Sequence, residues 1–174
     1  SVVGDIENGV SEFLPGMDSV VFTAGSGAHT GPEKTTDVDQ NAAIRLIEDC
    51  VNAGVRRFCM VSAIGADPES ESDRIRHYLR AKGIADNHLR ASGLDYVILQ
   101  PGRLQDEPGT GRIEVAEDLE RHETIAREDV ADAIIECLRN YLTIGKTIRM
   151  VSGELKIKDA IAQFAGGGNL PPIA

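Results

Sequence analysis

Apolar residues occur along the chain in two kinds of pattern: short consecutive runs, and longer stretches in which they recur every three or four positions. Four consecutive runs begin at Ser19, Arg57, Asp95 and Thr147. Consecutive apolar residues are typical of parallel strands that are covered on both faces of a sheet. The pattern therefore predicts four buried strands.

The stretches between these runs predict helices. Apolar residues recur at helical spacing over residues 37–53 and 72–92, from residue 127 onward, and over residues 157–164. Strand and helix thus alternate, which predicts an α/β fold with a parallel sheet wound right-handedly.

The chain is expected to form one domain over residues 1–174, because no linker or internal repeat divides it. Its glycine- and proline-rich end, residues 165–174, cannot extend a helix and is expected to be a mobile tail.

The net charge changes the range of partners to consider. Lysine and arginine number 18 and aspartate and glutamate 28, for a net charge of -10. An acidic surface repels phosphate backbones, so no nucleic-acid partner is expected. No apolar run reaches the length of a membrane span, so no membrane partner is expected either.

The three cysteines, Cys50, Cys59 and Cys137, lie in apolar surroundings without metal-binding spacing. We expect reduced, buried thiols in a cytoplasmic protein.

Small residues gather at three predicted strand ends. The first strand runs into residues 23–26, the second into residues 61–65, which include Val61 and Ser62, and the third into Gln100, Pro101, Gly102 and Arg103. Ligands of open parallel sheets bind at the carboxyl ends of the strands, where small residues let a flat ligand approach the backbone. Tight turns use glycine and serine for structural reasons as well, but three converging turns favour a binding edge.

Tyr78 and Lys82 are four residues apart on a predicted helix, so both face the same side. A nearby ammonium stabilises a phenolate, and Lys82 is therefore expected to lower the pKa of Tyr78. Such a tyrosine serves as the general acid or base of a carbonyl reduction. A chance pair on a solvated helix has the same spacing, so the motif is weak by itself.

Order and context add to that motif. The segment "VSAIGAD", followed by a loop and "HYLRAKGIADNHL", resembles the short-chain dehydrogenase/reductase superfamily, and more narrowly its atypical, NmrA-like NAD(P)-binding branch. The segments "VVGDIEN", "VVFTAGSG", "LDYVILQPGRL" and "REDVADAIIECL" match that branch in the same order, so the resemblance covers essentially the whole chain.

The resemblance implies a Rossmann-like, doubly wound parallel sheet and an NAD(P)-dependent oxidoreductase. Hydride would pass to a small carbonyl, quinone or flavin-like substrate, with Tyr78 as proton donor, Lys82 as its partner and ribose contact, and Ser62 orienting the carbonyl. The implied cofactor contacts are Asp5, Thr23, Ala24, Gly25, Ser26, Val61, Ser62, Tyr78, Lys82, Pro101, Gly102 and Leu104. NADP is favoured over NAD, and the protein is expected to be a monomer or a homodimer with a small-molecule substrate.

Two departures from the family pattern keep an alternative open. Ala63 stands where the family often has a second serine or threonine. The family's first strand, its G-x-x-G-x-x-G turn and its second strand would precede Ser1, so we expect that an N-terminal piece is missing from this chain. The alternative is a module that binds NAD(P) and senses its redox state without turnover.

The glycine-rich stretch Gly25–Gly31 looks at first like a pyrophosphate loop. In such a loop the helix opens among the glycines, whereas here Pro32 precedes any sustained helical pattern, and no acidic residue closes the next strand. We therefore expect this stretch to cover the adenosine end of the cofactor.

Overall fold

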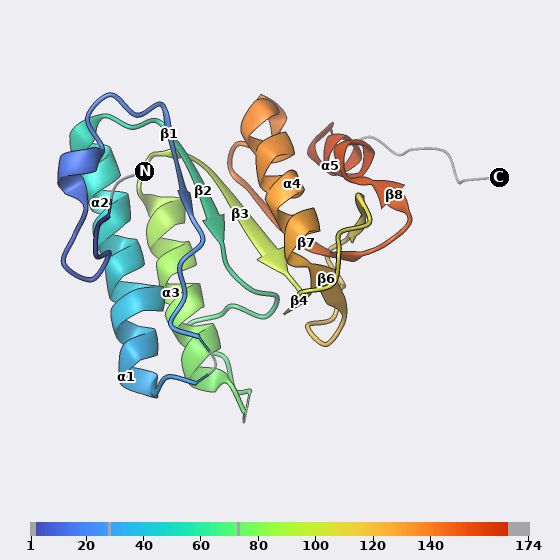
Figure 1. Ribbon diagram of the computed structural model, residues 1–174, viewed down its shortest axis with the longest axis horizontal. Helices are drawn as coiled ribbons and strands as arrows, with labels where there is room; N and C mark the ends of the chain where they lie inside the picture. Colours follow the sequence, from blue (N-terminus) through green and yellow to red (C-terminus); the bar gives the residue numbers. More distant parts are fainter. Residues whose placement is uncertain (1–2, 28, 73, 167–174) are drawn as a thin grey trace.

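A computed structural model describes residues 3–27, 29–72 and 74–166. Six strands form one sheet in the order β1-β2-β3-β7-β5-β8, and a pair of short strands, β4 and β6, forms a second. Helices cover both faces of the large sheet (Figure 1). The predicted α/β fold is confirmed.

The elements follow one another along the chain as a single series. They are η1 (Ser11–Phe13), β1 (Ser19–Phe22), α1 (Pro32–Thr35), η2 (Thr36–Ala42), α2 (Ala43–Ala53), β2 (Arg57–Val61), α3 (Arg76–Ala91), β3 (Asp95–Pro101), β4 (Arg103–Gln105), β5 (Arg112–Val115), β6 (Thr124–Ala126), α4 (Arg127–Arg139), η3 (Tyr141–Thr143), β7 (Lys146–Ser152), β8 (Leu155–Lys156) and α5 (Ile157–Gly166).

The four predicted strands are β1, β2, β3 and β7, and they are parallel neighbours. Their register places Phe22, Met60, Ile98 and Thr147 in one row across the sheet. The carboxyl ends of β1, β2 and β3 therefore meet at one edge, as the three small-residue turns required.

Four strands were not predicted: β4, β5, β6 and β8. All are short, and β5 alternates exposed Arg112 and Glu114 with buried Ile113, so no consecutive apolar run marks it. β5 is antiparallel to β7 and to β8, so the sheet is parallel only as far as β7.

The helix expected from residue 37 begins earlier, at Pro32. Proline is favoured in the first turn of a helix because its missing N–H would be unpaired there, and the polar first turn carries no apolar periodicity. The argument that Pro32 precedes the helix was therefore wrong. The loop Thr23–Gly31 still separates β1 from α1, so the glycines lie outside the helix.

Two other helix boundaries differ. α3 begins at Arg76 rather than residue 72. α5 continues to Gly166, so the expected tail keeps only residues 167–174, which lie outside the described residues. Within the described ranges, the helices lack the combination of length and apolar composition that a membrane crossing needs.

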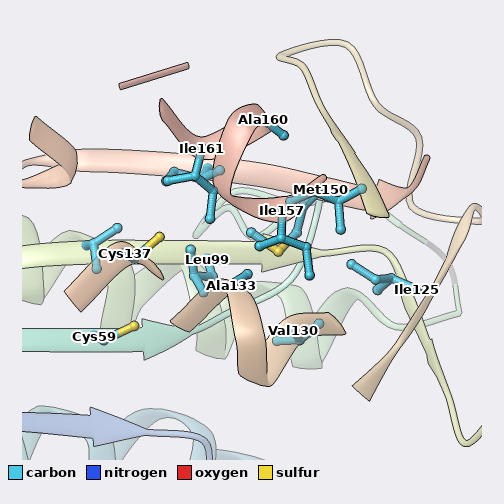
Figure 2. Packing of buried hydrophobic residues seen from close by; sticks show 13 residues of the cluster. Cys59, Leu99, Ile125, Val130, Ala133, Cys137, Met150, Ile157, Ala160 and Ile161 are labelled. Carbon is cyan, nitrogen blue, oxygen red and sulfur yellow. The ribbon is translucent and has the colours of Figure 1, made fainter. Parts of the chain in front are cut away.

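The core has one main apolar cluster on each face of the sheet, because successive strand residues point to opposite faces. Phe58 and Met60 of β2 pack beneath α2 and α3. Cys59 belongs to a cluster on the other face with residues of α4 and α5, among them Cys137 and Ile161, which Figure 2 labels. The three cysteines are free and buried, as expected.

Gly83 lets α3 approach the loop that follows β2. A Cβ atom at Gly83 would lie 2.5 Å from the backbone nitrogen of Pro68. Helix propensity alone would make Gly83→Ala stabilising by about 1 kcal/mol. We instead expect a loss of about 1–3 kcal/mol in unfolding free energy, measured by urea denaturation, because backbone must move.

Gly166→Ala, at the end of α5, is the control, because no atom of the described residues lies within 4 Å of its added Cβ. A gain in stability for Gly83→Ala would show that α3 does not pack against Pro68 this closely.

Candidate active site at the carboxyl edge of the sheet

Helix α3 presents three polar side chains toward the sheet. Tyr78, Lys82 and Asp86 are spaced by four residues, so they form a row along one helix face. Lys82 and Asp86 are buried and Tyr78 is half-buried. This row lies over the ends of β2 and β3, which supply Ser62 and Gln100.

Lys82 forms a buried ion pair with Asp39 of η2. The distance from Nζ to Oδ1 is 2.9 Å, and the two side chains are 4% and 0% exposed. Lys82 Nζ also donates, more weakly, to the carbonyl oxygens of Ala24 at 3.5 Å and Val61 at 3.4 Å. The ammonium is thus held between the ends of β1 and β2.

Asp39 is enclosed by the loop that follows β1. Its Oδ2 accepts a hydrogen bond from the Ser26 N–H at 3.0 Å. A Cβ atom on Gly25 would lie 3.2 Å from its Oδ1, so glycine lets the loop close around the carboxylate. Asp39 lies in η2, which has the wide turns of a π-helix, a conformation that often occurs at functional sites.

The phenol of Tyr78 is the one group whose predicted pKa direction was wrong. Burial raises the pKa of Tyr78 to about 12, and the nearby Asp39 and Asp86 add to the increase, while Arg121 opposes it. Lys82 Nζ is 5.8 Å from the centre of the ring. Lys82 does not lower the Tyr78 pKa because Asp39 already balances its charge.

Ser62 and Gln100 both donate to one oxygen of Asp86. Ser62 Oγ lies 2.9 Å and Gln100 Nε2 3.0 Å from Asp86 Oδ2. The other oxygen, Oδ1, has no hydrogen-bond partner in the described part of the chain. Burial raises the pKa of Asp86 to about 6, although both hydrogen bonds, Arg90 and Lys82 act to lower it. The Ser62 hydroxyl expected to orient a carbonyl is therefore engaged with Asp86.

Other residues predicted to contact the cofactor lie at the ends of β1 and β3. Thr23 and Gly25 are exposed, so the open end of β1 offers backbone without a covering side chain. Gly102 follows β3 and donates its N–H to Met150. Pro101 ends β3 and accepts from the Ile64 N–H. These positions fit a flat ligand that lies across the strand ends.

Two predicted contacts lie apart from the cluster. Asp5 is in an exposed turn, where its carboxylate accepts hydrogen bonds from the Glu7 N–H and the Asn8 side chain. Leu104 belongs to β4 and packs against the apolar cluster beneath α4. The structure does not bring either side chain to the Lys82 ion pair.

Two residues of the site were missed from the sequence: Asp39 and Asp86. Each had a signal, because a charged or polar residue stood where the pattern calls for an apolar one. Asp39 precedes Ala42, Ala43 and Leu46 at helical spacing, and Asp86 continues the four-residue spacing of Tyr78 and Lys82 by one turn.

No cluster suited to a metal ion occurs in residues 3–27, 29–72 and 74–166. Two cavities of about 420 and 410 Å³ lie away from Tyr78 and Lys82. The first lies between β5 and α5. The second lies beside α3 and β7 and is lined by Arg90, Gln100 and Arg149, among others.

Known proteins resemble this chain over most of its length. Residues 1–141 match the model of the NAD(P)H-binding family. The chain is 40% identical over 168 residues to YhfK of Bacillus subtilis, described as an uncharacterized sugar epimerase, covering 94% of this chain and 78% of that protein.

Solved structures agree with that match. A Bacillus halodurans protein, provisionally named as an NAD-dependent epimerase/dehydratase, is 41% identical, with a TM-score of 0.88 over 93% of this chain and 77% of its own. The oxidoreductase ylbE of Lactococcus lactis is 33% identical, with a TM-score of 0.82 over 95% of this chain and 77% of its own. The fold is therefore the Rossmann-like fold of NAD(P)-binding proteins.

The Lys82–Asp39 pair should be strongly coupled. Lys82→Met leaves the Asp39 carboxylate buried without its partner, and we expect a loss of about 3–5 kcal/mol in unfolding free energy. The double variant Lys82→Met/Asp39→Asn removes both charges and should recover most of that loss in urea denaturation. Additive single and double losses would contradict the coupling.

Asp86 should make the protein less stable as pH rises. Its pKa in the folded state, about 6, exceeds the ordinary 3.8, so the folded state binds more protons between these values and loses stability with rising pH. Asp86→Asn removes this loss. The variant should exceed the parent by about 3 kcal/mol near pH 8 and by little near pH 4.

The measurement is urea denaturation across this pH range, with Asp132→Asn, an exposed position on α4, as the control. A difference between Asp86→Asn and the parent that does not change with pH would contradict the buried titration.

Proposed function

The chain belongs to the NAD(P)H-binding family, and on that premise we propose that it is an NAD(P)-dependent oxidoreductase of the atypical, NmrA-like short-chain dehydrogenase/reductase type. Its substrate is a small carbonyl, quinone or flavin-like molecule. The observation that carries the proposal is the position of Tyr78 beside Lys82, over the carboxyl ends of the parallel strands.

Each side chain has a definable part in this proposal. Tyr78 keeps its proton at neutral pH because its pKa is raised to about 12, so it is available as a proton donor to a carbonyl oxygen. Lys82 fixes the loop after β1 and the end of β2 through its hydrogen bonds to Ala24 and Val61. The nicotinamide, when bound, supplies the hydride.

The dinucleotide is proposed to lie across the strand ends, on Thr23–Ser26, Val61, Pro101 and Gly102. Support comes from the open, small-residue end of β1, where Thr23 and Gly25 are exposed. NADP is the proposed cofactor. The buried, reduced cysteines fit a cytoplasmic protein, proposed here as a monomer or homodimer.

A second candidate is a module that binds NAD(P) without turnover. It is favoured because the polar groups of the site already interact with one another. Lys82 is paired with Asp39, and the Ser62 hydroxyl donates to Asp86. Ala63 offers no replacement hydroxyl. A module of this kind binds the dinucleotide and leaves every carbonyl substrate unchanged.

Tyr78→Phe separates the two candidates. For an oxidoreductase, we expect kcat to fall by about 10²–10⁴, because the proton donor is lost while the ring is kept. The assay follows NADPH absorbance with quinones, flavins, small carbonyls and nucleotide sugars. Dinucleotide affinity, measured by titration calorimetry, should change little.

Tyr141→Phe is the matched control, because Tyr141 is 78% exposed in η3. Undiminished turnover in Tyr78→Phe would eliminate the proposed role of Tyr78. Dinucleotide binding by the parent, together with no reaction on any substrate, would favour the binding module.

A further inference from the structure

The hydroxyl of Ser62 has a defined direction in this structure. Ser62 immediately follows β2, next to Val61, whose carbonyl accepts from Lys82. A hydroxyl has one proton to donate, and here Ser62 donates it to Asp86 Oδ2. Ser62 therefore has only oxygen lone pairs left for any other partner.

Asp86 is held in a fixed position to accept this hydrogen bond. Its side chain is 0% exposed, and its Oδ2 also accepts from Gln100. Two donors on one oxygen orient the carboxylate from β2 and β3 at once. Because Oδ1 has no partner within the described residues, it is the atom on which the carboxyl group can accept a proton without breaking either bond.

Charged groups face Asp86 from several sides. On α3 itself, Lys82 lies one turn before it, and Arg90 lies one turn after it, with Nη2 at 3.9 Å from Oδ2. Tyr78 lies two turns before it, and from η2 Asp39 neutralises Lys82. Arg90 and Gln100 both line the cavity of about 410 Å³ beside β7, so this cavity borders the buried network.

We infer that Asp86 is a positioning residue that sets the hydrogen-bonding role of Ser62. While Asp86 is ionised, it accepts the hydrogen bond that the Ser62 hydroxyl donates, and Ser62 in turn accepts a hydrogen bond from a substrate hydroxyl. When Asp86 is protonated, it holds Ser62 less strongly, and the Ser62 proton becomes available to a substrate carbonyl. This inference rests on the proposed function. It adds that pH determines whether Ser62 hydrogen-bonds a substrate carbonyl or a substrate hydroxyl.

The first test measures the Ser62–Asp86 bond without any turnover. In the chain labelled with ¹³C at aspartate carboxyls, the Asp86 resonance is the one absent from Asp86→Asn. It should titrate near pH 6. Ser62→Ala should raise this midpoint by about half a unit, because the lost hydrogen bond favoured the ionised form. An unchanged midpoint in Ser62→Ala would overturn the inference.

The second test measures the effect on catalysis. With NADPH and menadione as the carbonyl probe, kcat of the parent should rise several-fold as pH falls through the Asp86 midpoint, with KM changing less. This rise should be absent from Asp86→Asn and Ser62→Ala and present in Asp132→Asn. Tyr78 does not contribute in this range, because its pKa is about 12.

The two tests fail in different ways. If Asp86→Asn keeps the pH profile of the parent, the inference is overturned while the proposed function stands. If NADPH and menadione give no turnover in the parent, the proposed function loses its support for that quinone. The carboxyl titration then decides the inference alone: a coupled midpoint supports it, and an uncoupled one overturns it.

Discussion

The buried ion pair between Lys82 and Asp39 is the interaction on which the carboxyl edge of the sheet depends. It joins α3 to η2, and the carbonyls of Ala24 and Val61 extend the connection to the ends of β1 and β2. Each charge alone would be costly in the low-dielectric interior, so the two must stay together. The loop after β1 and the helix that carries Tyr78 are therefore held in a fixed relation before any ligand arrives.

The main features of the fold were predictable because burial leaves a direct mark on the sequence. Parallel strands covered on both faces contain consecutive apolar residues, as Phe58–Val61 does. The short strands beyond β7 contain no such run of consecutive apolar residues. β8 has two residues and β5 has one buried residue, so their pairing follows from neighbours distant in sequence rather than from their own composition.

The site was only partly predictable. The row of Tyr78 and Lys82 and the convergence of the strand ends follow from helical spacing and sheet topology. The electrostatics do not, because the pKa of Tyr78 is raised first by burial and then by Asp39, an acid in another helix that pairs with Lys82. Spacing shows which groups can meet along one helix, whereas the neighbours brought by tertiary packing determine the protonation state of each group.

Ser62 and Gln100 occupy equivalent places on adjacent strands. On the α3 face, β2 and β3 are apolar through Met60 and Ile98, and both become polar two residues later. Ser62 and Gln100 both donate to the carboxylate of Asp86. Loss of either donor would leave a buried acceptor short of a partner, and loss of Asp86 would strand two donors. Among relatives, these three positions are therefore expected to change as a set, so their covariation would reveal the network without a structure.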